Sequence, residues 1–258
     1  MKLNASIDKL FNAHFTWLVI VGLVTAGLTS FAEEKKDMKP IHYETRFGRG
    51  EWNPKDWTFV KSPRWNYIGD WVQEDDHIRN RIPEGVGENE LIADRYSYAY
   101  MSMVRNTPFE TSQGLDISAR MSFSYDQAPQ IVLADRLGAN EDGYPEYRDH
   151  YEIILWSKGI NVWRHIYREG KPGWARVAYA RFPLEAGTKY DLAVRIEPVA
   201  RSKNGPAEAG RMVVVTVDGQ HSVAFHAPEL PDSVYVGIIG YASYNRFYHF
   251  SVSQDARP

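Results

Sequence analysis

The sequence predicts an all-β fold, an antiparallel β-sandwich of the jelly-roll type. Short runs of β-branched and aromatic residues follow one another along the chain, and turn signals separate them with no long helical pattern between. Hairpin signals stand between strong runs, as at Asp218-Gly219 and at residues 157–159. The run Met212–Val217 is too apolar for an exposed sheet edge, so we expect a strand in the interior of a sheet.

Residues 33–50 are charged and lack periodicity, so we expect a lead-in before a single jelly-roll domain over residues 51–258. The polar stretch Val199–Arg211 contains Gly and Pro, which predicts a long exposed loop between two strands. The expected strands, in chain order, are Trp71–Arg79, Ser97–Arg105, Leu115–Tyr125, Gln130–Asp135, His150–Trp156, Asn161–Tyr167, Ala175–Ala180, Tyr190–Ile196, Met212–Val217, Ser222–His226, Tyr235–Tyr241 and Arg246–Val252.

Composition excludes several classes of protein. The chain of 258 residues is 43% hydrophobic and 24% charged, which argues against a disordered chain and against a polytopic membrane protein. The net charge of −3 comes with no basic stripe, so we expect no nucleic-acid partner. Cysteine is absent, which excludes disulfides, zinc–thiolate sites and thiol nucleophiles.

The first 32 residues predict a signal peptide. An apolar stretch from Trp17 to Leu28 precedes a Ser-Phe-Ala sequence ending at Ala32, and charged residues follow at once. The alternative is an uncleaved anchor, because residues 15–32 just reach the ~18 residues that a membrane span needs. Cleavage after Ala32 predicts a secreted or periplasmic protein with no membrane contact once processed.

Alternation in two neighbouring runs predicts a mixed polar and aromatic surface. In His150–Trp156 and in Asn161–Tyr167 every second residue is polar or aromatic except Ile154, and residues 157–160 between them read as a hairpin turn. A tight register would make His150 and His165 cross-strand neighbours. The residues expected on this shared face are His150, Glu152, Trp156, Asn161, Trp163, His165 and Tyr167.

Flat aromatic rings beside hydrogen-bonding groups suit a sugar-binding groove. The block from Tyr144-Pro145-Glu146-Tyr147 to His165 and the closing GIIGYASYNRFYHFSVS resemble the concanavalin A-like lectin/glucanase jelly rolls over most of residues 50–254. Within these, the chain is most similar to bacterial members that accompany uronate-polysaccharide degradation. The resemblance implies the fold and a saccharide ligand, but that superfamily includes hydrolases, lyases and binding modules, so fold does not choose among them.

A glycosidase needs two suitably spaced carboxylates. The jelly-roll glucanases that the chain resembles carry them as Glu-x-Asp-x-x-Glu, and the residues after Glu152 do not continue that motif. Glu146 and Asp149 lie in a turn-like stretch and fit a solvated loop or a calcium ligand set. We therefore expect no required cofactor, allow for a structural calcium ion, and assign no metal ligands at the functional site.

β-Elimination on a uronate needs a group that neutralises the carboxylate, a base and an acid. Planar donors of Arg and Asn match a carboxylate, and His and Tyr act as acid or base where no carboxylate pair is present. We assign His150 or His165 as base and Tyr167 as acid, although each histidine taken alone is better explained as a hydrogen-bonded, half-buried side chain. The candidates for substrate binding are Arg148, Asn161 and Arg164, the last of which strict alternation points to the opposite face, together with Arg136, Glu152, Trp156 and Trp163.

The sequence favours a secreted lyase acting on an acidic poly- or oligosaccharide. A non-catalytic carbohydrate-binding protein, with Trp156, Trp163 and Tyr167 as a stacking platform, is the first alternative. A glycoside hydrolase is the second. Tyr96, Tyr98 and Tyr100 alternate along another run, and core packing explains them better than a sugar platform does.

Overall fold

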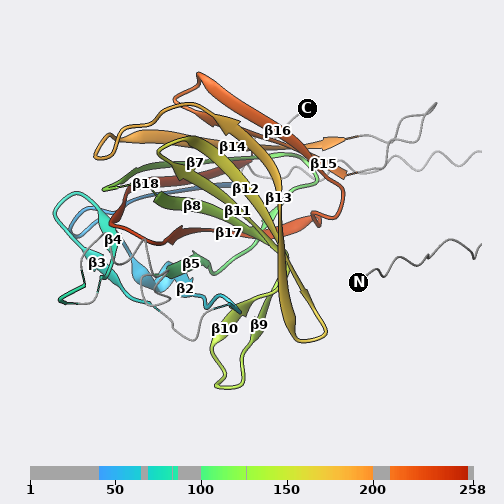
Figure 1. Ribbon diagram of the computed structural model, residues 1–258. Coiled ribbons are helices and arrows are strands. Elements are labelled where there is room, and N and C mark those ends of the chain that lie inside the picture. The colour runs from blue at the N-terminus through green and yellow to red at the C-terminus, as the bar shows by residue number, and fades with distance from the viewer. Residues whose placement is uncertain are drawn as a thin grey trace, which may run out of the picture. The chain divides into compact units, whose positions relative to one another are not determined.

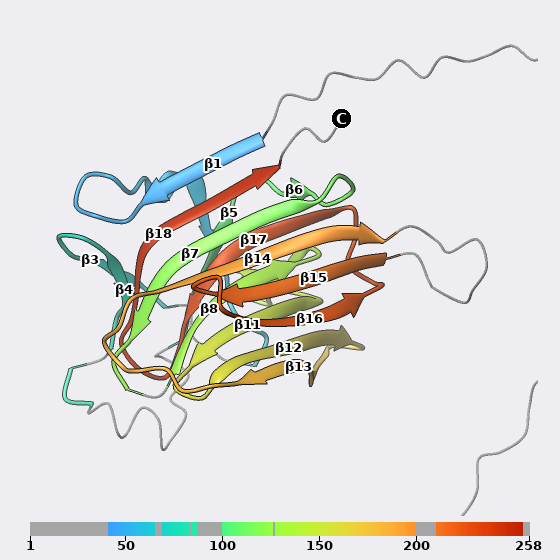
Figure 2. The ribbon, with the colours of Figure 1, turned by 90° about the horizontal axis from the view of Figure 1, so that it is seen from above.

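A computed structural model describes residues 41–64, 69–82, 84–86, 100–125, 127–199 and 210–254, which form two antiparallel β-sheets packed face to face (Figures 1 and 2). The chain divides into two compact units, Met1–Asp37 and Met38–Pro258, and every described residue belongs to the second. The predicted signal peptide over residues 1–32 lies outside the described residues. No helix among the described residues is long and apolar enough to span a membrane.

Sheet A consists of strands paired antiparallel throughout. Strands β7 and β18 lie at its centre and are flanked on both sides. In spatial order the strands are β16 (His221–Ala227), β15 (Gly210–Val217), β14 (Tyr190–Val199), β7 (Leu115–Phe123), β18 (Asn245–Gln254), β4 (Ile78–Asn80) and β3 (Trp71–Gln73), and β1 (Ile41–Arg46) also pairs with β18.

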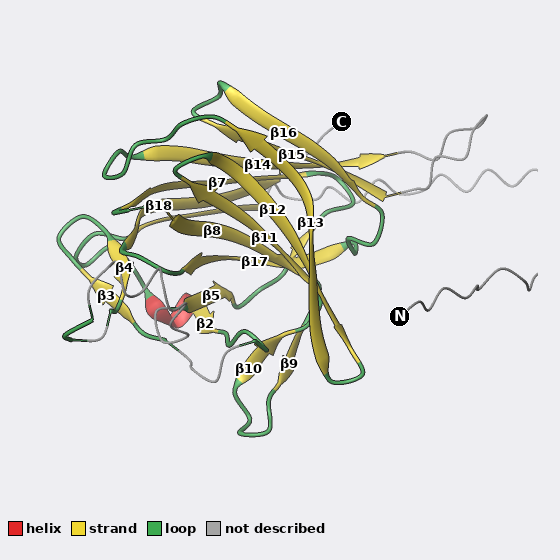
Figure 3. Cartoon of the chain, in the orientation of Figure 1, coloured by secondary structure: helices red, strands yellow, loops and turns green. Residues whose placement is uncertain are grey.

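Sheet B is the second layer, and it presents the surface of functional interest. Its spatial order is β13 (Lys171–Arg181), β12 (Gly159–Arg168), β11 (His150–Trp156), β8 (Gln127–Ala134), β17 (Ser233–Gly240), β5 (Met101–Arg105) and β2 (Trp57–Phe59), and β6 (Phe109–Glu110) also pairs with β17. A separate hairpin, β9 (Leu137–Ala139) and β10 (Pro145–Tyr147), lies on the side of sheet B that faces away from sheet A (Figure 1). A single 3₁₀ turn, Pro54–Asp56, is the one helical segment among the described residues (Figure 3).

The hydrophobic core fills the space between the two sheets. Strands contribute every second side chain to it: Ile117, Ala119 and Met121 from β7 are no more than 2% exposed, and so are Ile131 and Leu133 from β8. Burial of each large aliphatic side chain contributes ~1.5–3 kcal/mol, so this layer is the main source of stability. The predicted antiparallel β-sandwich is confirmed.

Several local predictions are also confirmed. Asp218 and Gly219 both have positive φ, 51° and 66°, in the turn between β15 and β16. Strand β15 contains Met212–Val217 and pairs on both edges, with β14 and with β16. The long exposed loop predicted over Val199–Arg211 remains a prediction, because residues 200–209 lie outside the described residues, and only the ends, Val199 in β14 and Gly210 and Arg211 in β15, are described.

The expected single strand Trp71–Arg79 is wrong. The backbone reverses within it, because residues 74–77 form a turn in which the Glu74 N–H donates to the His77 carbonyl at 2.8 Å. The two acidic residues inside this turn, Asp75 and Asp76, are poor strand formers and good turn formers. The result is the hairpin β3–β4.

The lead-in prediction also fails over Ile41–Arg46, which is strand β1. Its polar and charged residues, such as His42 and Glu44, point to solvent, while Thr45 faces inward and is buried. A strand at a sheet margin with few buried positions shows little hydrophobic alternation, so the sequence hid it. The prediction that Glu146 lies in a turn-like stretch is also wrong, because this residue lies in the short strand β10.

Candidate functional site

The hairpin β11–β12 has the register that the alternation predicts. His150 lies opposite His165, Glu152 opposite Trp163, and Ile154 opposite Asn161. The intervening residues of β11, such as Ile153, point into the core between the sheets. The polar and aromatic side chains therefore share the face of sheet B that is turned away from sheet A, which we call the outer face.

A second, small hydrophobic cluster covers one end of the outer face. Residues 60–62 run beside β10: the Lys61 N–H donates to the Pro145 carbonyl at 2.8 Å, and the Tyr147 N–H donates to the Lys61 carbonyl at 3.1 Å. This layer buries the polar side chains beneath it. The cluster consists of Val60, Tyr100, Val104, Val132, Ala134, Tyr147 and Ile239.

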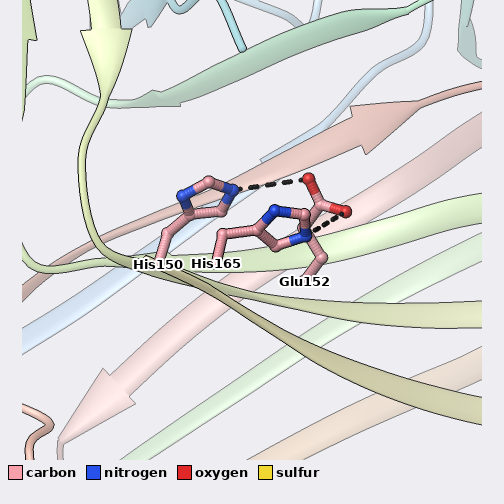
Figure 4. A group of neighbouring side chains, drawn as sticks. All are labelled: His150, Glu152 and His165. Atoms are coloured by element: carbon pink, nitrogen blue, oxygen red, sulfur yellow. Dashed lines mark hydrogen bonds and ion pairs between the residues drawn. The ribbon is translucent and has the colours of Figure 1, made fainter. Parts of the chain in front are cut away.

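Three of the buried polar side chains form one group, His150, Glu152 and His165, each at most 4% exposed (Figure 4). The Glu152 carboxylate lies at the edge of both imidazoles, with Oε1 at 3.4 Å from His150 Nε2 and Oε2 at 3.1 Å from His165 Nε2. The two rings are stacked, with centroids 4.5 Å apart and planes 7° from parallel. Arg64 reaches the same carboxylate at 3.5 Å.

The surroundings set the charge of this group. Burial lowers the pKa of His165 below its ordinary value, although Glu152 pulls in the opposite direction. Burial works against ionisation of Glu152, yet the imidazoles and the Arg64 guanidinium hold the pKa of this carboxyl well below its usual range. The group thus combines an ionised carboxylate with a neutral, buried His165 at neutral pH.

A pocket opens on the outer face beside this group, with a cavity volume of about 140 Å³. Its walls include three aromatic side chains, and its floor is formed by buried polar ones. The Gln130 side chain is 2% exposed, and its Oε1 has no hydrogen-bond partner among the described residues. We call this the Trp163 pocket, and its lining residues are Arg64, Tyr100, Ala128, Gln130, Glu152, Ile154, Trp163, His165, Trp174 and Tyr241.

Tyr167 and Arg148 lie apart from the Trp163 pocket. The Arg148 guanidinium is stacked over the Tyr167 ring at 4.5 Å and pairs with Glu146 at 2.7 Å. Tyr167 lines a different cavity, shared with Lys61 and with the turn between β9 and β10. The predicted acid and the predicted bases are thus on one face, but His165 lines the Trp163 pocket whereas His150 lines a third cavity with Asp149 and Arg164.

Two further arginines do not reach the pocket. Arg164 points to the core side of the sheet, as strict alternation predicts, and pairs with Glu229 at 2.8 Å. Arg136 is exposed beside Asp135, with a nitrogen–oxygen distance of 3.8 Å. Neither arginine is placed to hold a ligand in the Trp163 pocket.

Trp156, Asn161 and Trp163 share the outer face, and Trp163 forms a wall of the pocket. The Asn161 Oδ1 and the Trp156 Nε1 are buried with no hydrogen-bond partner among the described residues. The Lys158 ammonium lies 5.5 Å from the Trp156 ring. These groups extend a polar and aromatic surface along the hairpin beyond the pocket.

Among the polar and aromatic pocket residues, four escaped the sequence interpretation: Arg64, Gln130, Trp174 and Tyr241. Gln130 interrupts an apolar run in β8, and a polar residue inside a central strand was the available signal. Arg64 comes from an irregular segment with no periodicity, so nothing in the sequence marks it. The core packing predicted for Tyr100 is confirmed, since Tyr100 is 1% exposed in the small hydrophobic cluster, whereas Tyr96 and Tyr98 lie outside the described residues.

The group of His150, Glu152 and His165 also offers three ligand atoms within 4.8 Å of one another. His150 Nδ1 donates to the Arg148 carbonyl at 2.8 Å, whereas His165 Nε2 lies 3.1 Å from the Glu152 carboxylate and forms no hydrogen bond among the described residues. Calcium prefers six to eight oxygen ligands, and this group supplies a single carboxylate.

No protein-family model and no curated protein matches this chain. Among solved structures, the chain is similar to the carbohydrate-binding module CBM66 from Bacillus subtilis, with 10% identity over 74% of this chain and 91% of that chain and a TM-score of 0.45. It is similar to the exoplasmic/lumenal domain of VIP36 in its Ca²⁺/Man3GlcNAc-bound form, with 11% identity over 80% and 86% and a TM-score of 0.49. It is also similar to the globular domain of T. cruzi calreticulin, with 12% identity over 83% and 87% and a TM-score of 0.46. Similarity at this level assigns no ligand and no activity to the chain.

Proposed function

We propose that this protein binds a saccharide in the Trp163 pocket. The observation that carries the proposal is the pairing of aromatic walls, Trp163, Trp174 and Tyr241, with a floor where the buried Gln130 Oε1 lacks a partner among the described residues. A buried polar atom without a partner costs about 1–3 kcal/mol, which a ligand hydroxyl recovers. Sugar C–H faces stack on aromatic rings, so one ligand class satisfies both the walls and the floor.

The size of the pocket suits part of a chain. Cavities that enclose a drug-sized ligand measure roughly 300–1,000 Å³, and this one measures about 140 Å³. One sugar unit therefore enters, and the rest of the ligand lies on the surface outside. Arg64 at the rim is a donor suited to a uronate carboxylate.

A second candidate function is β-elimination on an acidic saccharide, which the state of His165 favours. A neutral His165 has one unprotonated ring nitrogen that serves as a base, and this residue lines the pocket. In the reaction that base takes the α-proton, a carbon–carbon double bond forms, and the bond to the leaving oxygen breaks. Tyr100 borders the same pocket, and burial raises its pKa well above the ordinary value, so it keeps a proton to donate to that oxygen.

A panel of neutral and uronate polysaccharides tests both candidates. Ultraviolet absorbance of an unsaturated product reports elimination, new reducing ends without absorbance report hydrolysis, and calorimetry reports binding alone. We expect Trp163→Ala and Gln130→Ala to weaken binding, and Tyr144→Ala, an exposed tyrosine outside the pocket, to leave it unchanged. Binding that survives both pocket substitutions would contradict the proposal, and turnover that survives His165→Ala would exclude His165 as the base.

A further inference from the structure

We propose that the outer face of β13 is a binding track for an anionic polysaccharide, continuous with the Trp163 pocket and formed by Trp174, Arg176, Tyr179 and Arg181. The inference rests on the proposed saccharide binding and names the ligand class. It adds a second site, along the edge of sheet B, at which the chain outside the pocket is held.

The register of β12 against β13 places the track. His165 pairs with Trp174, and Trp163 pairs with Arg176. Trp174 also lines the Trp163 pocket, so the track begins at the pocket wall. Two further pairs lie farther along β13, toward Arg181: Asn161 pairs with Tyr179, and Gly159 pairs with Arg181.

A β-bulge keeps these four side chains on one face. The register shifts between Val162 and Trp163, so that Val177 on β13 has no opposite residue. Ala178 then pairs with Val162, which points into the core. Since side chains alternate along a strand, the extra residue brings Tyr179 and Arg181 onto the face that Trp174 and Arg176 already occupy.

The track exposes aromatic rings that the fold itself does not need. Trp174 is 54% exposed and Tyr179 is 60% exposed, among the highest values for large hydrophobic side chains in the described residues. Arginine side chains hold them in place: the Arg176 guanidinium lies 4.7 Å from the Tyr179 ring, and Arg64 lies 5.3 Å from the Trp174 ring. Exposed rings with a fixed orientation are stacking platforms for sugar units.

Charge on residues 157–181 is predominantly positive, although the whole chain has a net charge of −3. Arg164 and Arg168 are paired with Glu229 and Asp149. No ion pair among the described residues involves the other four cations of this segment, Lys158, Lys171, Arg176 and Arg181. Residues 157–181 contain the cations Lys158, Arg164, Arg168, Lys171, Arg176 and Arg181, and Glu169 as their single acidic residue.

Protection of a sheet edge explains part of this pattern only. Lys and Arg on an edge strand deter pairing with another chain, but exposed Trp174 and Tyr179 would promote association rather than deter it. A polymer that carries both sugar faces and carboxylates or sulfates uses the rings and the cations together. At ~3.3 Å per residue the track from Trp174 to Arg181 is roughly 20 Å long, which is several sugar units.

The test compares polymers with short fragments. Alginate, polygalacturonate and hyaluronan are the anionic probes, dextran is the neutral one, and disaccharides of each polymer report on the pocket alone. Tyr179→Ala and the pair Arg176→Ala/Arg181→Ala should weaken binding of an anionic polymer by about tenfold or more, and leave its disaccharide unaffected. The matched control is Arg120→Ala/Arg195→Ala, two arginines about half exposed on sheet A.

The outcomes separate the track from the pocket. If Trp163→Ala weakens binding and the β13 variants bind the polymer like wild type, the track is overturned and the pocket stands. If the pocket variants also bind like wild type, or if no probe binds, both proposals fail. Equal affinity for dextran and the anionic polymers, equal affinity for duplex DNA, or a dimer that the β13 substitutions dissociate would each overturn the assignment to an anionic polysaccharide.

Discussion

Glu152 shows how a single buried carboxylate organises its neighbours. Its two oxygens face two imidazoles, and Arg64 approaches from the pocket side. The contacts of its oxygens with the two imidazoles and with Arg64 offset the cost of burying its charge. Because the group is nearly free of solvent contact, its protonation is coupled to folding.

The first prediction, at the residue scale, concerns pH. The pKa of His165 is lowered in the folded protein, so the unfolded chain binds more protons just below the ordinary histidine pKa, and stability rises with pH through that window. Urea unfolding should give a higher free energy of unfolding at pH 7.5 than at pH 5.5. His165→Asn should flatten this difference, and an undiminished difference in the variant would contradict the assignment.

The second prediction at the residue scale concerns the Glu152 carboxylate, which affects stability at lower pH than His165 does. The pKa of Glu152 is lowered on folding, so its contribution to stability is present above the ordinary glutamate pKa and is lost as pH falls through the folded value. We expect Glu152→Gln to destabilise the protein at pH 7 and to remove part of the acid sensitivity of the wild type below pH 4. Parallel pH profiles of urea unfolding for the two proteins would show that Glu152 is not ionised in the fold.

At the scale of elements, the hairpin β11–β12 and its neighbour β13 build the site. The period of two in each strand fixes which side chains share a face, which is why the sequence predicts the opposition of His150 and His165. The Val177 bulge changes that period once in β13, and no pattern in the sequence announces it. The bulge hides that Tyr179 and Arg181 share the outer face, whereas Trp174 is missed because the expected strand begins at Ala175 and β13 begins at Lys171.

Gly159 permits the close approach of β12 and β13. Its φ is 121°, and a Cβ there would lie 2.1 Å from the Ala180 carbonyl oxygen. We predict that Gly159→Ala costs ~3 kcal/mol or more, from backbone strain together with the clash. Gly143→Ala, at a φ of 83° with open space around it, should cost only ~1–2 kcal/mol. Equal losses in thermal or urea unfolding would contradict this account of Gly159.

On the scale of the whole molecule, strands far apart in sequence meet at the Trp163 pocket. Gln130 comes from β8, Tyr241 follows β17, and Arg64 precedes β3. Alternation predicts the face of a strand but not which strands become neighbours, so the sequence could supply the hairpin side of the site and not the rest. Edge strand β1 was missed because outward charges masked its pattern.

One whole-molecule prediction concerns processing of the chain. If residues 1–32 are a signal peptide, N-terminal sequencing of exported protein should begin at Glu33. Protein that retains Met1 and fractionates with membranes would support the anchor reading in place of cleavage.

The most direct test of the central claim, saccharide binding in the Trp163 pocket, is to follow assigned tryptophan indole N–H signals by NMR during titration with the polysaccharide panel. The account predicts that Trp163 and Trp174, which line the pocket, shift on binding, whereas the core residues Trp57 and Trp71 do not. Binding that leaves the Trp163 and Trp174 signals unmoved would place the ligand elsewhere and contradict the account.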